Sequence, residues 1–192
     1  GRPAVLDGAM GTELAARGVE AGAVACVEHP EAVLEVHRAY VEAGADAILT
    51  NTFSMTRLYA QTHGIAHDPA VLNRQGALLA RQAAAGRPVL GDMSSTGRML
   101  EPLGECTEAQ CVGAFREQAG WLAEAGCDAL IIETMSDLRE ARCALRGALE
   151  AGLPVVVSMT LMTHANGGRT MMGDNAADCA AALEAEGASA FG

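Results

Sequence analysis

The chain has 192 residues, which suits one domain with a sizeable core, so we expect a single domain over residues 1–192. Its formal net charge of −11 argues against a nucleic acid or an anionic membrane surface as partner, because both attract positively charged patches. No apolar run approaches the roughly 18 residues that span a bilayer, and no signal-like segment begins the chain. We therefore expect a cytoplasmic protein.

The six cysteines show no CxxC pair and no spacing typical of a disulfide framework, which predicts reduced thiols. Cys143 and Cys179 fall among helical Ala and Leu residues, where a small core residue is the simplest interpretation. The histidines form no HxH or HExxH pattern, and the spacing of Cys106 and Cys111 is weak for a metal site. The residues themselves therefore assign no metal ligand.

One unit repeats along the chain: a helix end closed by Gly, followed by an apolar run that stops on a polar residue. Gly accommodates the left-handed conformation that ends a helix, and a continuous apolar run fits a parallel strand covered on both faces. The unit predicts six strands, at residues 4–7, 46–50, 88–92, 128–133, 154–160 and 188–192.

Helices are predicted between these strands. Pro30 suits the first turn of one helix, and Thr107 is a good N-cap for another. Ser136 or Asp137 caps the next helix, and Asn175 or its neighbours open the last. The predicted helical ranges are 30–44, 69–85, 107–126, 136–149 and 175–187.

Alternating strands and helices predict an α/β fold with a parallel sheet. A closed (β/α)8 TIM barrel has eight strands and typically about 250 residues, so this chain predicts an incomplete barrel of about six strands, truncated before the last ones. An open doubly wound sheet is the alternative. However, the turn at residues 8–12 lacks the GxGxxG spacing and the later acidic partner of that fold.

Polar residues end the apolar runs, where parallel α/β folds bind ligands. We expect Asp7, Asn51, Asp92, Glu133 and Thr160 to converge there. The acids Asp7 and Glu133 would perform acid–base chemistry, hold an ammonium group, or cap neighbouring loop amides.

Three further segments each have a functional and a structural interpretation. Residues 8–12 form a Gly-rich turn that either offers N–H groups to an anion or needs Gly for its dihedral angles. Residues 50–53 either grip a small polar substrate or stabilise a turn. Residues 167–170, with Met159, Met162, Met171 and Met172, form a mobile flap or a surface loop with adaptable apolar anchors. His37 is most simply a helix residue beside the core.

Taken together, short segments across essentially the whole chain resemble the homocysteine-binding domain of homocysteine S-methyltransferases. Residues 49–53 and 102–104 are most similar to the N-terminal module of cobalamin-dependent methionine synthase, and residues 27–33 to betaine–homocysteine methyltransferase. The segments that carry the resemblance are 6–13 (LDGAMGTE), 29–33 (HPEAV), 37–40 (HRAY), 43–46 (AGAD), 50–53 (TNTF), 91–92 (GD), 133–134 (ET) and 168–170 (GRT).

The resemblance implies a TIM barrel that binds homocysteine as its zinc thiolate and methylates it to methionine. A thiol with a pKa near 8.5 is mostly protonated at neutral pH, and zinc coordination removes that proton. By position, the implied substrate-binding residues are Asp7 and Glu133 for the ammonium group, the backbone N–H groups at Gly8 and Ala9 for the carboxylate, and Asn51, Thr52 and Phe53 as the pocket lining.

The chain departs from the family at the metal. The family's zinc ligands are three cysteines beyond strand six, and none of the six cysteines here occupies a matching position. We therefore expect the zinc ligands beyond residue 192 and an inactive fragment. The expected partners are homocysteine and a methyl donor or cobalamin module. The sequence leaves methylcobalamin, betaine, S-methylmethionine and S-adenosylmethionine open as donors.

Two other functions remain open at this stage. A truncated, noncatalytic barrel would serve as a binding or assembly module, because its open strand edges invite association. A metal-free barrel enzyme, such as a hydrolase, would use Asp7 and Glu133 as acid and base.

Overall fold

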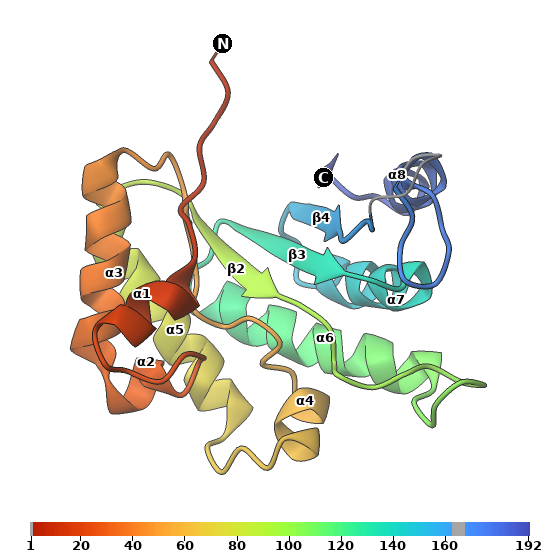
Figure 1. Ribbon diagram of the computed structural model, residues 1–192, viewed down its shortest axis with the longest axis horizontal. Helices are drawn as coiled ribbons and strands as arrows, with labels where there is room; N and C mark the ends of the chain where they lie inside the picture. The colour runs from red at the N-terminus through yellow and green to blue at the C-terminus, as the bar shows by residue number, and fades with distance from the viewer. Residues whose placement is uncertain (1, 163–167) are drawn as a thin grey trace.

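A computed structural model of the protein describes residues 2–162 and 168–192, and it contains a five-stranded parallel sheet in the order β1-β2-β3-β4-β5 (Figure 1). The strands are β1 (Ile48–Leu49), β2 (Val89–Met93), β3 (Ala129–Met135), β4 (Val155–Met159) and β5 (Ala190–Phe191). The helices are α1 (Met10–Ala16), α2 (Ala25–Glu28), α3 (Pro30–Ala43), α4 (Arg57–Thr62), α5 (Pro69–Ala83), α6 (Glu108–Glu124), α7 (Leu138–Leu149) and α8 (Ala176–Ala185).

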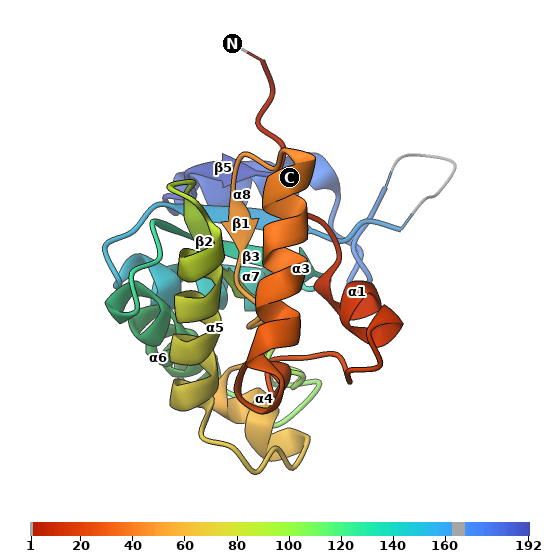
Figure 2. The same cartoon turned by 90° about the vertical axis from the view of Figure 1, so that its left-hand side faces the viewer.

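The order of the strands distinguishes the two predicted architectures. Each strand pairs in parallel with the next along the chain, and the order never reverses as it does in a doubly wound sheet. Helices α3, α5, α6, α7 and α8 pack successively against one another and against the sheet, and α3, α5 and α6 stand side by side in Figure 2. This is the winding of a TIM barrel, and the prediction of an incomplete α/β barrel is confirmed.

The first predicted strand is the main difference from the sequence prediction. Residues 4–7 form only one parallel bridge, from Leu6 to Ala47, and the second predicted strand shortens to β1. The ladder is interrupted because the Val5 N–H donates to the Asp46 carboxylate at 2.9 Å rather than to a backbone carbonyl. Residues 2–162 and 168–192 thus contribute five strands of the sheet and the Leu6–Ala47 bridge in place of six strands.

The predicted helix starts agree with the structure. Pro30 occupies the first turn of α3, and Thr107 caps α6 in a reciprocal capping box with Gln110. Asp137 rather than Ser136 caps α7, and Asn175 caps α8. The short helices α1, α2 and α4 lie in the connections between these longer elements (Figure 1).

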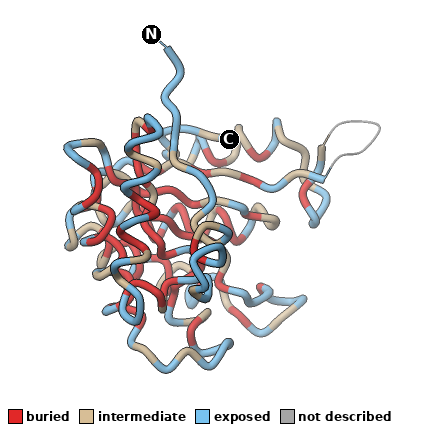
Figure 3. Tube along the Cα trace, turned by 60° about the vertical axis from the view of Figure 1, so that its left-hand side comes forward, coloured by how far each residue is buried: buried red, intermediate tan, exposed pale blue. Residues whose placement is uncertain are grey.

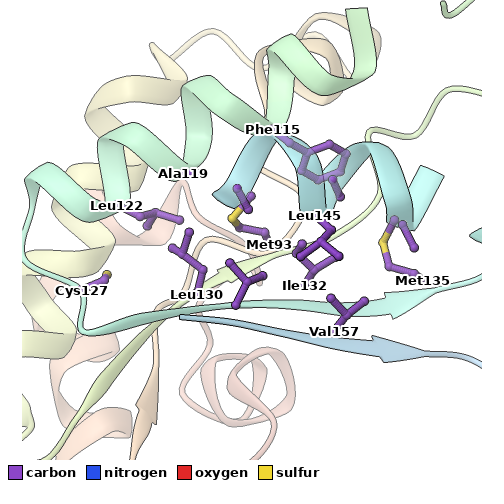
Figure 4. Close-up of a cluster of buried hydrophobic side chains, with 14 of the residues drawn as sticks. Met93, Phe115, Ala119, Leu122, Cys127, Leu130, Ile132, Met135, Leu145 and Val157 are labelled. Atoms are coloured by element: carbon purple, nitrogen blue, oxygen red, sulfur yellow. The ribbon is translucent and has the colours of Figure 1, made fainter. Parts of the chain in front are cut away.

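The main core lies between the sheet and helices α6 and α7, as Figure 4 shows. Leu130 and Ile132 of β3 point into this core, toward Leu122 of α6 and Leu145 of α7. Burial is concentrated along the strands and the helix faces that cover them (Figure 3). All six cysteines are free and buried, and Cys143 and Cys179 lie in the core as predicted. His37 of α3 is fully buried.

The opposite face of the sheet carries a smaller apolar cluster of Ala47, Leu90 and Ile131. We call this the inner face, since it faces away from the helices. Among the described residues, no helix is long and apolar enough to cross a membrane.

Candidate functional site

A cavity of about 670 Å³ opens where the inner face meets the carboxyl ends of the strands. It brings together four of the five residues expected to converge: Asp7, Asn51, Asp92 and Glu133. Thr160 does not line it, because this residue is exposed beyond β4 and donates its N–H to Met135. The lining residues are Asp7, Gly8, Ala9, Met10, Gly11, Thr12, Ala21, Gly22, Leu49, Thr50, Asn51, Phe53, Asp92 and Glu133.

The alternation of side chains along β2 directs Asp92 toward the inner face. Val89 and Met93 belong to the helix-side core, and a Cβ atom on Gly91 would meet Leu122 and Leu130 in that core. Leu90 belongs to the inner cluster, so Asp92, two residues later, shares its face.

A β-bulge lies next to Glu133 in β3. Ile132 pairs with Val157 but Met135 pairs with Met159, so β3 contains one extra residue here. Thr134 adopts a left-handed φ of 59°, which is unusual for a β-branched residue. Glu133 lines the cavity because it shares the inner face with Ile131, two residues earlier. The bulge returns Met135 to the helix-side core, and the Ser94 hydroxyl donates to the Glu133 carbonyl at 2.8 Å.

Asp7 joins the site from the N-terminal bridge. Its N–H donates to the Ala47 carbonyl at 3.2 Å, and its Oδ2 accepts the Leu49 N–H at 3.0 Å. The second carboxylate oxygen has no protein donor among the described residues. Asp7 is therefore held by β1 with one oxygen free for a ligand.

The three carboxyl groups share an environment that favours a proton or a cation. Burial raises the pKa of Asp7 to about 6. Burial also raises the pKa of Glu133, and burial followed by the charges of Glu133 and Asp7 raises the pKa of Asp92 well above its usual value. No Lys, Arg or His is among the described residues that line the cavity. The cavity is thus suited to a cationic group.

The Gly-rich turn lies beside these carboxyl groups. A Cβ atom on Gly8 would come within 2.8 Å of the Tyr40 hydroxyl, which donates to the Ala9 carbonyl at 3.0 Å. Gly8 is therefore needed for this close approach rather than for a left-handed dihedral angle. Ala9 begins α1 without a side-chain cap, and in the part of the chain that the structure describes the N–H groups of Gly8 and Ala9 have no protein acceptor.

The segment after β1 contributes unequally to the cavity. Asn51 lines it and donates to the Gly22 carbonyl at 2.9 Å, and Phe53 lines it with 43% of its surface exposed. Thr52 was expected to line the pocket with them, but it is fully buried and absent from the lining. Its side chain points instead toward β2, where its hydroxyl donates to the Asp92 carbonyl at 2.7 Å.

Thr50 and Thr52 hold the main chain of Asp92 in place, a role that the sequence did not predict. The Asp92 N–H donates to the Thr50 hydroxyl at 2.9 Å, the two threonine hydroxyls lie 2.5 Å apart, and Thr52 returns to the Asp92 carbonyl. This closed ring of hydrogen bonds fixes the main chain of Asp92. The TNT triplet is the only signal for it in the sequence, since pairing with residue 92 depends on strand register.

The segment expected to form a flap or a surface loop is described only from Gly168 onward, and Gly167 lies outside the described residues. Arg169 forms antiparallel bridges with Met162 and Asn175. Met162, Met171 and Met172 are exposed, whereas Met159 is buried. None of these residues lines the cavity.

The residues present do not form a zinc site. The cavity lining contains no Cys or His, and burial raises the pKa of the nearby Cys26 thiol to about 12. Over residues 2–162 and 168–192, no group of three or more His, Cys, Asp or Glu side chains is arranged to hold a metal ion. We therefore derive no chemical step through a metal.

This combination of a singly wound parallel sheet and a ligand cavity at the carboxyl ends of its strands defines a TIM-barrel protein. Comparisons with known proteins agree. The homocysteine methyltransferase MmuM from Escherichia coli, in its metallated form, superimposes with a TM-score of 0.82 at 25% identity, over 99% of this chain and 74% of that one. Its apo form gives a TM-score of 0.77 at 27% identity, over 98% of this chain and 70% of that one.

Sequence comparisons identify the family. The family model described as homocysteine S-methyltransferase matches residues 4–192. The methionine synthases of Mycobacterium tuberculosis and Mycobacterium leprae are each 32% identical over the whole chain, which covers 18% and 17% of their lengths. The chain belongs to the homocysteine S-methyltransferase family, and it spans less than a fifth of these curated relatives.

Proposed function

We propose that this chain binds L-homocysteine in the cavity and, within a methyltransferase of the methionine synthase type, presents its thiol for methylation to methionine. The observation that carries the proposal is the pair Asp7 and Glu133, which lines the same cavity as Gly8 and Ala9, whose N–H groups have no protein acceptor among the described residues. An α-amino acid has an ammonium and a carboxylate on adjacent atoms, so it needs both kinds of group within one site.

In this proposal each part of the site has one task. Asp7 and Glu133 accept hydrogen bonds from the ammonium group, as charge-assisted bonds that are stronger than neutral ones. Gly8 and Ala9 donate to the substrate carboxylate at the start of α1, where Tyr40 holds the turn. Asn51 and Phe53 line the side of the cavity.

Zinc and the methyl donor are further parts of the proposal. Similarity to methionine synthases supports methylcobalamin as donor and a zinc ion that lowers the pKa of the substrate thiol. The zinc ligands would lie beyond residue 192, because the described residues offer no suitable set. We also propose a cytoplasmic location, for which the six cysteines without a disulfide-framework spacing are the support.

Calorimetric titration with L-homocysteine tests the binding step. We expect saturable binding to the chain and a loss of about 10-fold or more in affinity for Glu133→Gln, because an ammonium–carboxylate hydrogen bond contributes about 1.5–3 kcal/mol. Glu124→Gln is the matched control, since it removes one carboxylate from an exposed position at the end of α6, away from the cavity.

The outcomes separate clearly. Equal affinity of the wild type and Glu133→Gln would show that homocysteine does not use this site. Absence of binding by a folded wild-type chain would refute the proposed function. A similar loss in Glu124→Gln would mean that overall charge, rather than the cavity, governs affinity.

A further inference from the structure

A third carboxyl group in the cavity has one oxygen without a donor among the described residues. Asp92 is only 6% exposed, and its Oδ1 is buried without a hydrogen-bond donor among the described residues. A buried acceptor without a donor costs free energy, so natural structures seldom leave one without a reason. This orphaned atom belongs to a residue that lines the cavity beside Asp7 and Glu133.

Two hydrogen bonds hold the main chain of Asp92. The ring through Thr50 and Thr52 satisfies both its N–H and its carbonyl, so the main chain cannot rotate the carboxyl group away. The register pairs Asp92 with Ile131, which places Glu133 two residues farther along the neighbouring strand on the same face. Asp92 and Glu133 are thus diagonal neighbours at one side of the cavity.

Resting on the proposed function, we propose that Asp92 is a third acceptor for the ammonium group and restricts this site to ligands with a primary amine. A primary ammonium group has three N–H donors, and the cavity presents three carboxyl groups. Asp7 has one oxygen occupied by the Leu49 N–H and one free, and Asp92 has the orphaned Oδ1. An N-methylated amine keeps only two donors and would place a methyl group against a carboxyl oxygen.

The electrostatics of the site give this arrangement a measurable signature. Burial, followed by the charges of Glu133 and Asp7, raises the pKa of Asp92, so its carboxyl group binds a proton more readily than an exposed aspartate does. An incoming ammonium group stabilises the carboxylate form. The O–H bond of the carboxylic acid then breaks and its proton passes to the buffer, while the ammonium keeps its own three protons. Ligand binding is therefore coupled to proton release.

The experiment compares three ligands: L-homocysteine, N-methyl-L-homocysteine and 4-sulfanylbutanoic acid, which lacks the amine. We expect the wild type to prefer L-homocysteine over its N-methyl analogue by about 10-fold or more, the effect of one charge-assisted hydrogen bond. Asp92→Asn should weaken L-homocysteine by a similar factor and change the affinity for 4-sulfanylbutanoic acid by less than about twofold. Glu124→Gln again controls for the loss of charge.

Calorimetry in buffers of different ionisation enthalpy supplies a second readout. The wild type should release protons on binding L-homocysteine, and Asp92→Asn should release fewer. A purely structural role for Asp92 would weaken all ligands alike and leave the proton release unchanged.

Each result bears on the inference. If the wild type binds L-homocysteine and its N-methyl analogue equally, the inference falls and the proposed function stands; this comparison does not require the variant to fold. Equal affinity of the wild type and Asp92→Asn for L-homocysteine has the same meaning. If the wild type binds no L-homocysteine, the proposed function and the inference fall together.

Discussion

The hydroxyl of Thr52 donates a hydrogen bond to the main-chain carbonyl of Asp92 at 2.7 Å, and so connects the segment after β1 to the end of β2. Thr50 accepts the Asp92 N–H and lies 2.5 Å from the Thr52 hydroxyl. Gln118 of α6 supports this unit from the helix side by donating to the Thr52 carbonyl at 3.0 Å. The cavity wall is therefore part of a buried polar network that continues to the outer helices.

Substitution Thr52→Val removes the hydroxyl but keeps the shape of the side chain. We expect a loss of about 1–3 kcal/mol in the free energy of unfolding, because the buried Asp92 carbonyl and Thr50 hydroxyl lose a partner. Chemical denaturation measures this change. Thr52→Ser keeps the hydroxyl and should recover most of the loss attributable to the hydrogen bonds. If Thr52→Val were as stable as the wild type, the ring would contribute nothing to the fold.

The close approach of α6 and α7 gives a second prediction. A Cβ atom on Gly147 would lie 2.5 Å from the Val112 carbonyl oxygen and 2.8 Å from the Arg116 nitrogen, both of them backbone atoms. Gly147→Ala should therefore force the helices apart and destabilise the protein by about 1–3 kcal/mol, as overpacking does.

Gly113→Ala in α6 is the matched control. A Cβ atom there has no neighbour within 4 Å, so the higher helix propensity of Ala should leave stability unchanged or raise it by up to about 1 kcal/mol. Thermal melts of the two variants check the contrast. A stable Gly147→Ala variant would show that the two helices can separate at little cost.

Local signals were sufficient to predict the long elements. Pro30, Thr107 and Asn175 begin helices in the structure because capping and first-turn preferences depend only on neighbouring residues. The apolar runs identified β2, β3 and β4 for the same reason. A full strand was predicted at residues 4–7, but only one bridge forms there. The reason is not local, because the Asp46 carboxylate takes the place of a backbone carbonyl as acceptor of the Val5 N–H.

The candidate site was predictable only in part. Placement at strand ends located Asp7, Asn51, Asp92 and Glu133 in one cavity. The inward turn of Thr52 depends on the partner strand, so a sequence motif alone suggested the wrong environment for it. The β-bulge that returns Met135 to the helix-side core likewise appears only from the register with β4. Tertiary pairing, rather than local preference, determines these details.

His37 supplies a prediction for the acid side of the stability curve. It is fully buried, and neither ring nitrogen has a hydrogen-bond partner among the described residues. Burial lowers the pKa of His37 to about 4. The unfolded chain, with an ordinary histidine pKa of about 6.5, binds this proton between about pH 6.5 and 4 while the folded protein does not. The free energy of unfolding therefore decreases as the pH falls through this window, by on the order of 3 kcal/mol in total.

His37→Leu removes that dependence. We expect the variant to be at least as stable as the wild type at pH 7.5 and to gain relative to it at pH 5, because an apolar side chain suits this unpartnered position. Urea denaturation at several pH values measures the difference between the two proteins. A constant difference across pH 4 to 7.5 would show that His37 finds a partner or solvent in the folded state.

Asp7 gives the opposite sign and connects stability to function. Its folded pKa of about 6 exceeds the ordinary aspartate value of about 3.9, so between these values the folded protein binds the extra proton. Asp7 therefore destabilises the free protein progressively as the pH rises through this window, and the full effect is present above about pH 6. Asp7→Asn should raise the free energy of unfolding at pH 7.5 by about 1–3 kcal/mol, since its amide oxygen still accepts the Leu49 N–H.

The same substitution should weaken homocysteine binding, because the ammonium group loses a charged acceptor. For the wild type, affinity should fall as the pH drops below about 6 and Asp7 becomes neutral, whereas Asp7→Asn should bind weakly with a flatter profile. Titration calorimetry from pH 5 to 8, beside denaturation of the free proteins, measures both effects. A variant that gained stability without losing affinity would remove Asp7 from the ammonium site. A variant that lost both would indicate that the carboxylate serves the fold through Leu49, and that the cost of burying its charge is not the dominant effect.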